Sequence, residues 1–210
     1  MVEIICLCHT VSEWWFRYPD KYGDNSYVAE GQRHLTLVDL WSVNVDEAIE
    51  ASAKDNVFSF MISRNPYEKI LSAYRDFYET FSNYPSIKSF LKKKKKKTNK
   101  LTFKLFIEYL VDLPLKSFDI HWMPMYLQCK PCQMKYDVVG RMDSLNEDSQ
   151  RIFSRLDLNT TLANDRLTHG GNSKDKLMKY YSEIDQELLE KLYNVYEMDF
   201  ILFDYDKNLL

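Results

Sequence analysis

The pattern of apolar and polar residues is most regular between Val57 and Tyr78. Residues 57–62 (VFSFMI) form an apolar run of strand length, which is typical of a strand buried inside a sheet. A helix is predicted directly afterwards, because Asn65 is a favourable N-cap and Pro66 takes the first helical position. Apolar residues then recur every three or four positions and predict a buried stripe: Tyr67, Ile70, Leu71, Tyr74, Phe77 and Tyr78. The polar residues fall on a different face: Glu68, Ser72, Arg75 and Glu79.

The remaining segments alternate between helices and short apolar strands. The pattern predicts helices over 45–53, 103–110, 144–156 and 180–196, and a strand over 136–139. Residues 1–56 otherwise read as an irregular N-terminal segment, and residues 57–210 as one domain. Short strands that alternate with dominant helices predict the α/β fold class.

The composition narrows the class of protein. The chain has 210 residues, of which 45% are hydrophobic and 28% charged, and this excludes a disordered or fibrous protein. Only five glycines and six prolines argue against a turn-rich all-β fold. No run reaches the roughly 18 apolar residues of a membrane span, and the first residues lack the basic start of a signal peptide.

The charge is distributed unevenly. The formal net charge is -3, yet Lys92–Lys97 and Lys100 concentrate positive charge in one Lys-rich loop at 91–100. The loop reads first as a solvated insertion between helices. Attraction of a sulfated or carboxylated glycan and nucleic-acid binding are the alternatives. We expect no nucleic-acid partner, because the aromatic residues belong to the predicted core and do not alternate with the lysines.

The junction of the predicted strand and helix is a candidate anion site. A helix N-terminus offers unpaired backbone N–H groups and the positive end of the helix dipole. Arg64 adds a forked, permanently charged donor that suits phosphate. Ser72 comes seven residues after Asn65 and returns to the same face about 10 Å along the helix. The alternative interpretation is that Arg64 is an ordinary surface cation and that Ser72 has no functional role.

The segment from Arg64 to Phe77 (RNPYEKILSAYRDF) resembles the 3′-phosphate-binding motif of PAPS-dependent sulfotransferases. It is most similar to the carbohydrate sulfotransferase family that contains the chondroitin and dermatan 4-O-sulfotransferases and the HNK-1 sulfotransferase (sulfotransferase family 2). Further segments follow in the family's order: FIEYLVD at 106–112, His121-Trp122, CKPC at 129–132, YDVVGR at 136–141, LYNVYEMDF at 192–200 and LFDY at 202–205.

This resemblance implies a P-loop-like sulfotransferase fold, in which helices flank a short parallel sheet and the donor lies outside the carboxyl ends of the strands. The implied reaction transfers a sulfuryl group from PAPS (3′-phosphoadenosine 5′-phosphosulfate) to a hydroxyl of a glycan and needs no metal. The glycan would be of the chondroitin or dermatan kind, or another proteoglycan or glycoprotein sugar. Arg64 and Ser72 would bind the donor's 3′-phosphate.

The resemblance also implies a cellular setting. Family members work on the lumenal side of the Golgi membrane and are held there by an N-terminal anchor, which this chain does not show. Residues 57–210 would then be a partial catalytic domain.

One family motif has no counterpart. Family members carry an N-terminal strand–loop–helix of the form Pro-Lys-x-x-x-Thr-Asn/Ser-Trp, which binds the 5′-phosphosulfate. Residues 9–14 (HTVSEW) contain a tryptophan but no lysine. The chain is interpreted as an incomplete version of the enzyme, because losing the lysine removes much of the transition-state stabilisation. The alternative is a catalytically silent relative that binds a glycan or another partner.

Two histidines are candidates for the catalytic base. His34 lies upstream of the anion motif, where related sulfotransferases often have a base, and His121 lies in the shared His-Trp pair. An imidazole titrates near neutral pH, which suits a base. Each is also explained by a hydrogen-bonded structural histidine.

The cysteines and one asparagine bear on the compartment. Cys129 and Cys132 fit half of a zinc site poorly, since Cys6 and Cys8 have unfavourable spacing for the other half. A redox pair would be expected at a helix start. Structural disulfides in an oxidising lumen fit the family resemblance better, with the pairing left open. Asn159 begins an Asn-Thr-Thr glycosylation sequence, which agrees with that setting.

Overall fold

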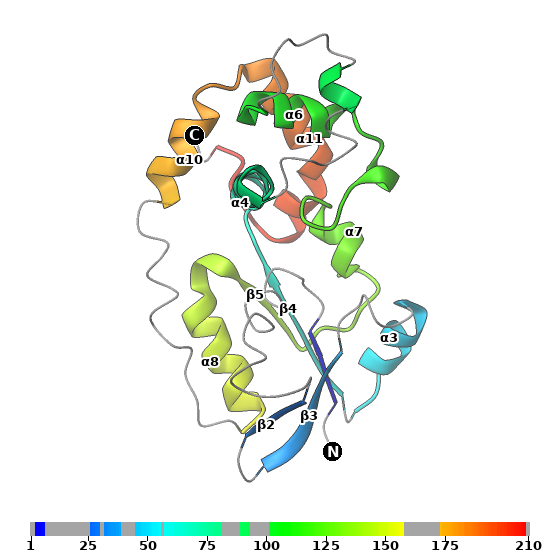
Figure 1. Cartoon of the computed structure of the whole chain (residues 1–210). Helices are drawn as coiled ribbons and strands as arrows, with labels where there is room; N and C mark the ends of the chain where they lie inside the picture. The colour runs from blue at the N-terminus through cyan, green and yellow to red at the C-terminus, as the bar shows by residue number, and fades with distance from the viewer. Residues whose placement is uncertain are drawn as a thin grey trace. The chain divides into compact units, whose positions relative to one another are not determined.

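The computed structural model describes residues 3–6, 26–29, 32–38, 45–55, 57–80, 89–92, 101–157 and 173–208. The chain forms two compact units, which can be followed by colour in Figure 1. Unit 1 contains residues 1–64 and 125–167, and unit 2 contains residues 65–124 and 168–210. The chain therefore passes from unit 1 to unit 2 directly after Arg64 and returns at Met125.

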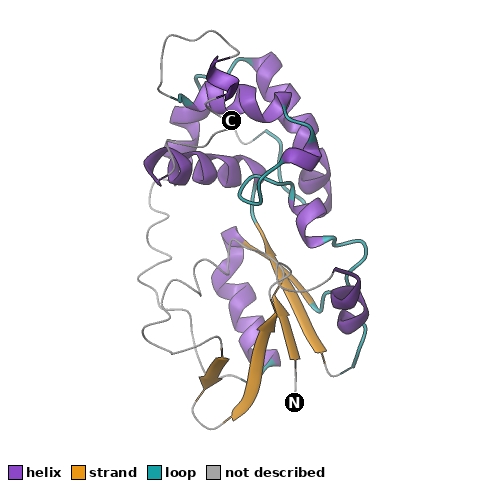
Figure 2. Ribbon diagram, turned by 45° about the vertical axis from the view of Figure 1, so that its right-hand side comes forward, coloured by secondary structure: helices purple, strands orange, loops and turns teal. Residues whose placement is uncertain are grey.

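Unit 1 is built on a five-stranded sheet with the strand order β2-β3-β1-β4-β5 (Figure 2). The strands are β1 (Glu3–Cys6), β2 (Ser26–Ala29), β3 (Gln32–Val38), β4 (Val57–Ser63) and β5 (Val138–Arg141). β1 is parallel to β3 and to β4, and β4 is parallel to β5, whereas β2 is antiparallel to β3. This confirms the predicted α/β class with a short parallel sheet.

Three of these strands lie in the N-terminal segment that the sequence pattern describes as irregular, and for these residues that description is wrong. β1 and β2 have only four residues each, and β3 begins with Gln32, Arg33 and His34, so no long apolar run marks any of them. β1 pairs with strands that are distant in sequence, since Glu3 pairs with Val57 and Ile4 with Leu37, whereas β2 pairs with its neighbour β3. Residues 7–25, which follow β1 in the sequence, lie outside the described residues.

The core of unit 1 surrounds β4, which is buried along its whole length. The helix α8 (Leu145–Arg155) packs against β5, and α3 (Val45–Ser52) packs against β4. An apolar cluster joins β4 to α8 through Phe58, Phe60, Ile62, Ile152 and Phe153, and Val138 of β5 packs against it. Two further short helices belong to this unit, α7 (Met125–Cys129) and η2 (Met142–Ser144).

Unit 2 consists of helices packed around α4. Its helices are α4 (Pro66–Thr80), α6 (Phe103–Asp112), η1 (Leu115–Ser117), α10 (Ser173–Tyr181) and α11 (Gln186–Leu202). α4 contacts α6, α10 and α11. Side-chain caps begin two of the helices: Thr102 Oγ1 accepts from the Leu105 N–H at 3.3 Å, and Asp185 Oδ1 from the Leu188 N–H at 3.0 Å.

The predicted stripe of α4 is confirmed where its side chains are described. Tyr67, Ile70, Leu71 and Tyr74 are buried, whereas Arg75 is exposed. Rings from other helices surround this stripe: the Tyr67 centroid lies 4.9 Å from that of Phe200, and the Tyr74 centroid lies 5.2 Å from that of Phe103. Burial of these large rings is the main apolar contribution to this unit.

Gly140 in β5 has no room for a side chain. A Cβ at this position would lie 2.7 Å from Ile62 Cδ1 and 2.9 Å from Asp148 Cβ. We expect Gly140→Ala to lower the free energy of unfolding by about 1–3 kcal/mol, because overpacking pushes β5 away from β4 and α8. Urea unfolding followed by circular dichroism measures the change. Val139→Ala, at a half-exposed neighbour, is the control, and equal losses in both variants would contradict the prediction.

Tyr67 links stability to alkaline pH. Burial, and to a smaller degree the nearby Tyr193, raises the pKa of Tyr67 to about 12. An unfolded tyrosine has a pKa of about 10. The stability that neutral Tyr67 contributes is therefore complete below about pH 10 and is lost as the pH rises toward 12. Between pH 10 and 12, we expect the free energy of unfolding, measured in urea, to fall by about 2 kcal/mol less in Tyr67→Phe than in the wild type. Identical pH slopes would refute this.

Candidate functional site

The carboxyl ends of three parallel strands meet at one edge of the sheet in unit 1. Ser63 at the end of β4 pairs with Arg141 at the end of β5, and Cys6 at the end of β1 pairs with Phe60. Arg64 directly follows Ser63 and so begins at this edge. In open α/β sheets, ligands bind outside this edge. Arg64 therefore begins at the edge where the donor is expected, and its part in binding an anion stays a prediction.

The backbone at the end of β4 is held in place by short contacts. Ser63 is completely buried, and its hydroxyl donates to the Gly140 carbonyl at 3.0 Å. The N–H of Arg64 donates to Met125 Sδ at 3.4 Å. The Arg64 side chain is half-buried. These contacts fix the point from which the guanidinium extends.

A second arginine ends the neighbouring strand. Arg141 donates to both carboxylate oxygens of Asp143, at 3.0 Å from Nε and 2.8 Å from Nη2. These hydrogen bonds are the main reason that the pKa of Asp143 is lowered. The N–H of Arg141 donates to the buried Asp148 carboxylate at 2.9 Å. Arg141 therefore stabilises the end of β5, a role that the sequence motif did not reveal.

The N-terminus of α4 has the predicted cap. Asn65 Oδ1 accepts from the Tyr67 N–H at 2.9 Å, and the Asn65 carbonyl accepts from the Lys69 N–H at 2.9 Å. Ser72 is half-buried in the second turn of the same helix, outside the buried stripe. Arg64 is the last residue of the first segment of unit 1, and Ser72 belongs to unit 2. Joint binding of one phosphate by both side chains stays a prediction.

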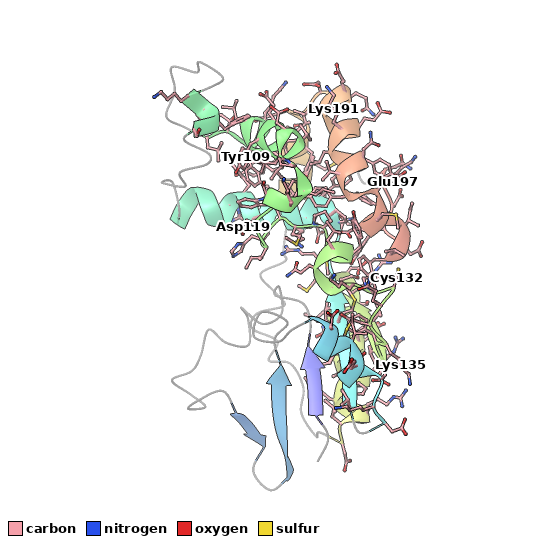
Figure 3. All side chains as sticks on the ribbon, turned by 90° about the vertical axis from the view of Figure 1, so that its right-hand side faces the viewer. Tyr109, Asp119, Cys132, Lys135, Lys191 and Glu197 are labelled. Carbon is pink, nitrogen blue, oxygen red and sulfur yellow. The ribbon has the colours of Figure 1, made fainter. Side chains whose placement is uncertain are left out.

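His121 lies in a tight turn of unit 2 together with a carboxylate that the sequence analysis missed. Asp119 Oδ1 accepts from the His121 N–H at 3.1 Å and is also hydrogen-bonded to His121 Nδ1. Asp119 is labelled in Figure 3. Its carbonyl closes the turn by accepting from the N–H of Trp122 at 3.1 Å and of Met123 at 2.8 Å. The spacing Asp-x-His, together with the tendency of Asp to bond the backbone two residues on, was the available signal.

The Asp119–His121 pair has a chemical consequence. When the carboxylate accepts the proton on Nδ1, the lone pair of the imidazole is on Nε2. Nε2 is then the ring nitrogen that is able to accept a hydrogen bond or a proton. The His121 side chain is 31% exposed, and its role as a base stays a prediction.

The turn itself is anchored in the aromatic core. Trp122 is 1% exposed, and its ring centroid lies 5.5 Å from that of Phe106. The Tyr196 hydroxyl donates to the Trp122 carbonyl at 2.5 Å. Burial, and to a smaller degree Asp199, raises the pKa of Tyr196 well above its usual value, so the hydroxyl keeps its proton at physiological pH.

His34, the other candidate base, is the third residue of β3, which ends at Val38. Its side chain lies outside the described residues. Its proposed role therefore stays a prediction.

The cysteine prediction is corrected for one residue. Cys129 is completely buried and disulfide-bonded, whereas Cys132 is a free, exposed cysteine (Figure 3). The two therefore do not pair with each other. The reason is the turn after α7, where the N–H groups of Gln133 and Met134 both donate to the Lys130 carbonyl and Cys132 is left at the surface.

Several predicted features lie outside the described residues. These include Asn159 and residues 93–100 of the Lys-rich loop. Within the described part of the chain, no group of three or more His, Cys, Asp or Glu side chains is arranged to hold a metal ion. None of the helices described combines the length and the apolar character of a membrane span.

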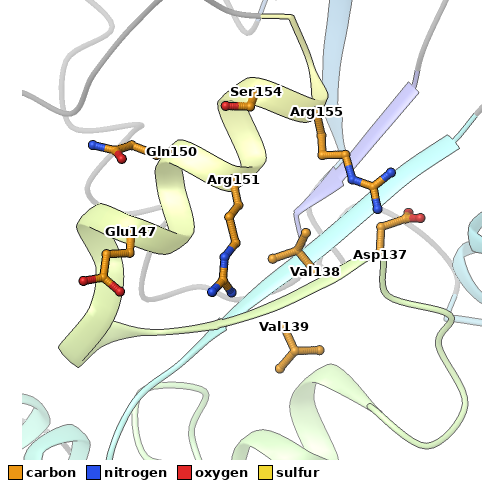
Figure 4. A pocket seen from close by; sticks show the side chains of 8 residues that line it. All are labelled: Asp137, Val138, Val139, Glu147, Gln150, Arg151, Ser154 and Arg155. Atoms are coloured by element: carbon orange, nitrogen blue, oxygen red, sulfur yellow. The ribbon is translucent and has the colours of Figure 1, made fainter.

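A shallow groove of about 610 Å³ lies beside β5 in unit 1 (Figure 4). Its lining comes from β5, the residue before it and one face of α8: Asp137, Val138, Val139, Glu147, Gln150, Arg151, Ser154 and Arg155. The acidic and basic side chains are mixed, and the groove follows the side of β5, not its carboxyl end. It is therefore separate from the edge at which the donor is expected.

Comparison with known proteins agrees with the motifs. The family model described as the sulfotransferase family matches residues 4–206. A carbohydrate sulfotransferase 14 from Danio rerio is 31% identical over 160 residues, which cover 70% of this chain and 44% of the relative. A carbohydrate sulfotransferase 11 from Mus musculus is 25% identical over 202 residues, which cover 88% of this chain and 57% of the relative. A carbohydrate sulfotransferase 10 from Gallus gallus is 27% identical over 166 residues, which cover 70% of this chain and 46% of the relative.

These alignments cover only part of each relative. The chain spans about half the length of the curated relatives that it matches. No solved structure matches it significantly. The family match begins at residue 4 and so includes β1 as well as the motifs between Arg64 and Tyr205. The chain therefore belongs to the sulfotransferase family, among the carbohydrate sulfotransferases.

Proposed function

We propose that this chain is part of a PAPS-dependent carbohydrate O-sulfotransferase, which transfers a sulfuryl group to a hydroxyl of a glycan. The observation that carries this proposal is the junction of β4 and α4. There Arg64 follows the carboxyl end of a buried parallel strand, and Asn65 caps the helix that carries Ser72. Family membership supports sulfate transfer to a sugar in general. PAPS as the donor, and a chondroitin-like or other proteoglycan or glycoprotein glycan as the acceptor, are our proposals.

In this proposal Arg64 and Ser72 bind the 3′-phosphate of the donor. A guanidinium makes strong, forked hydrogen bonds with phosphate oxygens, and a serine hydroxyl adds a neutral donor. The dipole of α4 favours an anion near its N-terminus. Binding at this end would place the rest of the nucleotide along the carboxyl edge of the sheet.

His121 is the proposed general base. The oxygen of the acceptor hydroxyl attacks the sulfur, its proton passes to His121 Nε2, and a new O–S bond forms. The bond between sulfur and the bridging oxygen breaks, and adenosine 3′,5′-bisphosphate leaves with its electron pair. Asp119 holds the ring in the required tautomer and stabilises the imidazolium that forms. These steps require no metal.

The alternative function is a catalytically silent relative that binds a glycan or another partner. The absence of a Pro-Lys-x-x-x-Thr-Asn/Ser-Trp sequence from residues 1–56 favours it. Without that lysine, the donor's reacting end lacks a cation that would stabilise the leaving group. Nucleotide binding and sulfate transfer therefore have to be measured separately.

We place the whole protein on the lumenal side of the Golgi membrane. The disulfide at Cys129 supports an oxidising compartment, where such bonds persist. Asn159 would be accessible to glycosylation there.

Isothermal titration with adenosine 3′,5′-bisphosphate tests the binding site. We expect the wild type to bind and Arg64→Ala to bind roughly 10- to 100-fold more weakly, because a hydrogen bond to a charged group contributes about 1.5–3 kcal/mol. Ser72→Ala should lower the affinity for the nucleotide less than Arg64→Ala does, since the serine hydroxyl is neutral. Arg155→Ala is the control, because this exposed arginine lies on α8. No binding by the wild type, or equal binding by wild type and Arg64→Ala, would refute the site.

Transfer of radiolabelled sulfate from PAPS to desulfated chondroitin tests the base. We expect His121→Gln to lower kcat by about 100-fold or more, as removal of a general base does, while nucleotide affinity stays unchanged. His34→Gln is the parallel variant, and a larger loss there would transfer the role of base to His34. Nucleotide binding without turnover by the wild type would establish the silent alternative.

A further inference from the structure

Two consecutive carbonyls next to His121 are hydrogen-bonded by side chains from two different helices of unit 2. Tyr196 of α11 donates to the Trp122 carbonyl at 2.5 Å. Lys69 of α4 donates from Nζ to the Met123 carbonyl at 2.6 Å. The turn that carries the histidine is therefore tied to both helices immediately after the ring.

Lys69 is an unusual residue at this position. It is 3% exposed and lies among the buried residues of α4, where its neighbour Ile70 is completely buried. Removing an ammonium group from water costs several kcal/mol unless hydrogen bonds compensate for the lost hydration. A methionine would fill a similar volume without that cost. Packing alone therefore does not explain a lysine here.

The position of Lys69 on α4 connects the two halves of the proposed reaction. It follows the N-cap Asn65 by four residues and precedes Ser72 by three, so all three lie on neighbouring parts of one helix face. Ser72 is the proposed ligand of the donor's phosphate, and the Met123 carbonyl lies two residues after His121. The Lys69–Met123 hydrogen bond thus joins the donor-binding helix directly to the turn with the proposed base.

We propose that Lys69 and Tyr196 are positioning residues, which hold the Asp119–His121 pair at a fixed place relative to α4. This inference rests on the proposed function. A base must lie within hydrogen-bond reach of the hydroxyl that it deprotonates, and a displacement of about 1 Å lowers a rate by roughly 100-fold. Both side chains act on the backbone directly after His121, through the Trp122 and Met123 carbonyls.

The test compares four variants in two measurements. Lys69→Met removes the ammonium donor with little change in volume, Lys69→Arg keeps a cationic donor, and Tyr196→Phe removes only the hydroxyl. Lys191→Met is the control, because Lys191 is an exposed lysine of α11 that pairs with Glu187. The measurements are steady-state sulfate transfer and the ¹³C NMR signal of the His121 ring in histidine-labelled protein, assigned with His121→Gln.

We expect Lys69→Met to lower kcat by roughly 100-fold while KM for PAPS changes by less than about threefold, because donor binding does not use the turn. Tyr196→Phe should lower kcat by about tenfold through the same displacement. Lys69→Arg should recover part of the loss. The His121 signal should shift or split in Lys69→Met and Tyr196→Phe and stay unchanged in Lys191→Met.

Wild-type kcat and an unchanged His121 signal in both Lys69→Met and Tyr196→Phe would overturn the proposal. If Lys69→Met does not fold, Tyr196→Phe decides, since it leaves the buried lysine in place. Absence of both nucleotide binding and transfer in the wild type would refute the proposed function. The NMR comparison still decides in that case whether these two side chains hold the His121 turn.

Discussion

The cap at Asn65 sets the start of α4, the helix around which unit 2 is packed. Asn65 follows a strand that is completely buried and precedes a helix whose first residue, Pro66, has no N–H to donate. Its side chain accepts a hydrogen bond from the N–H of Tyr67 at 2.9 Å, and it is itself only 6% exposed. An apolar residue here would leave a buried donor unpaired, at about 1–3 kcal/mol. The change from extended to helical backbone is thus set by one amide.

Buried tyrosines solve the corresponding problem in the loops of unit 2. Loops have carbonyl groups that no helix satisfies, and burying them unpaired is unfavourable. Three tyrosine hydroxyls donate to such carbonyls: Tyr67 to Lys207, Tyr74 to Leu101 and Tyr196 to Trp122. A fourth, of Tyr181, donates to the Tyr67 carbonyl in the first turn of α4. Each ring also fills space in the core. An apolar side chain of the same size would fill that space but could not donate the hydrogen bond.

The parts of the fold that could be predicted are those with local signals. β4 and α4 carry a continuous apolar run, an N-cap and a helical stripe, and each signal lies within a few residues of the element that it marks. β1 and β3 could not be found in this way, because β1 is short and β3 has polar residues, and both depend on pairing with distant partners. The site shows the same division. A role for Arg64 could be proposed from its place after a strand, whereas none could be proposed for Lys69, since only tertiary packing buries its ammonium group.

The sheet order also narrows the question of catalysis. β1 lies between β3 and β4 and is parallel to both, so the chain leaves β1 at the same edge at which Arg64 follows β4. A donor anchored at this edge by its 3′-phosphate would present its phosphosulfate to the ends of these neighbouring strands. Among residues 7–25, which come next in the sequence, the permanently charged cations are Arg17 and Lys21. Neither occupies the lysine position of the family motif. In the proposed reaction, the cation that neutralises the leaving group would therefore come from one of these two side chains or from another part of the protein.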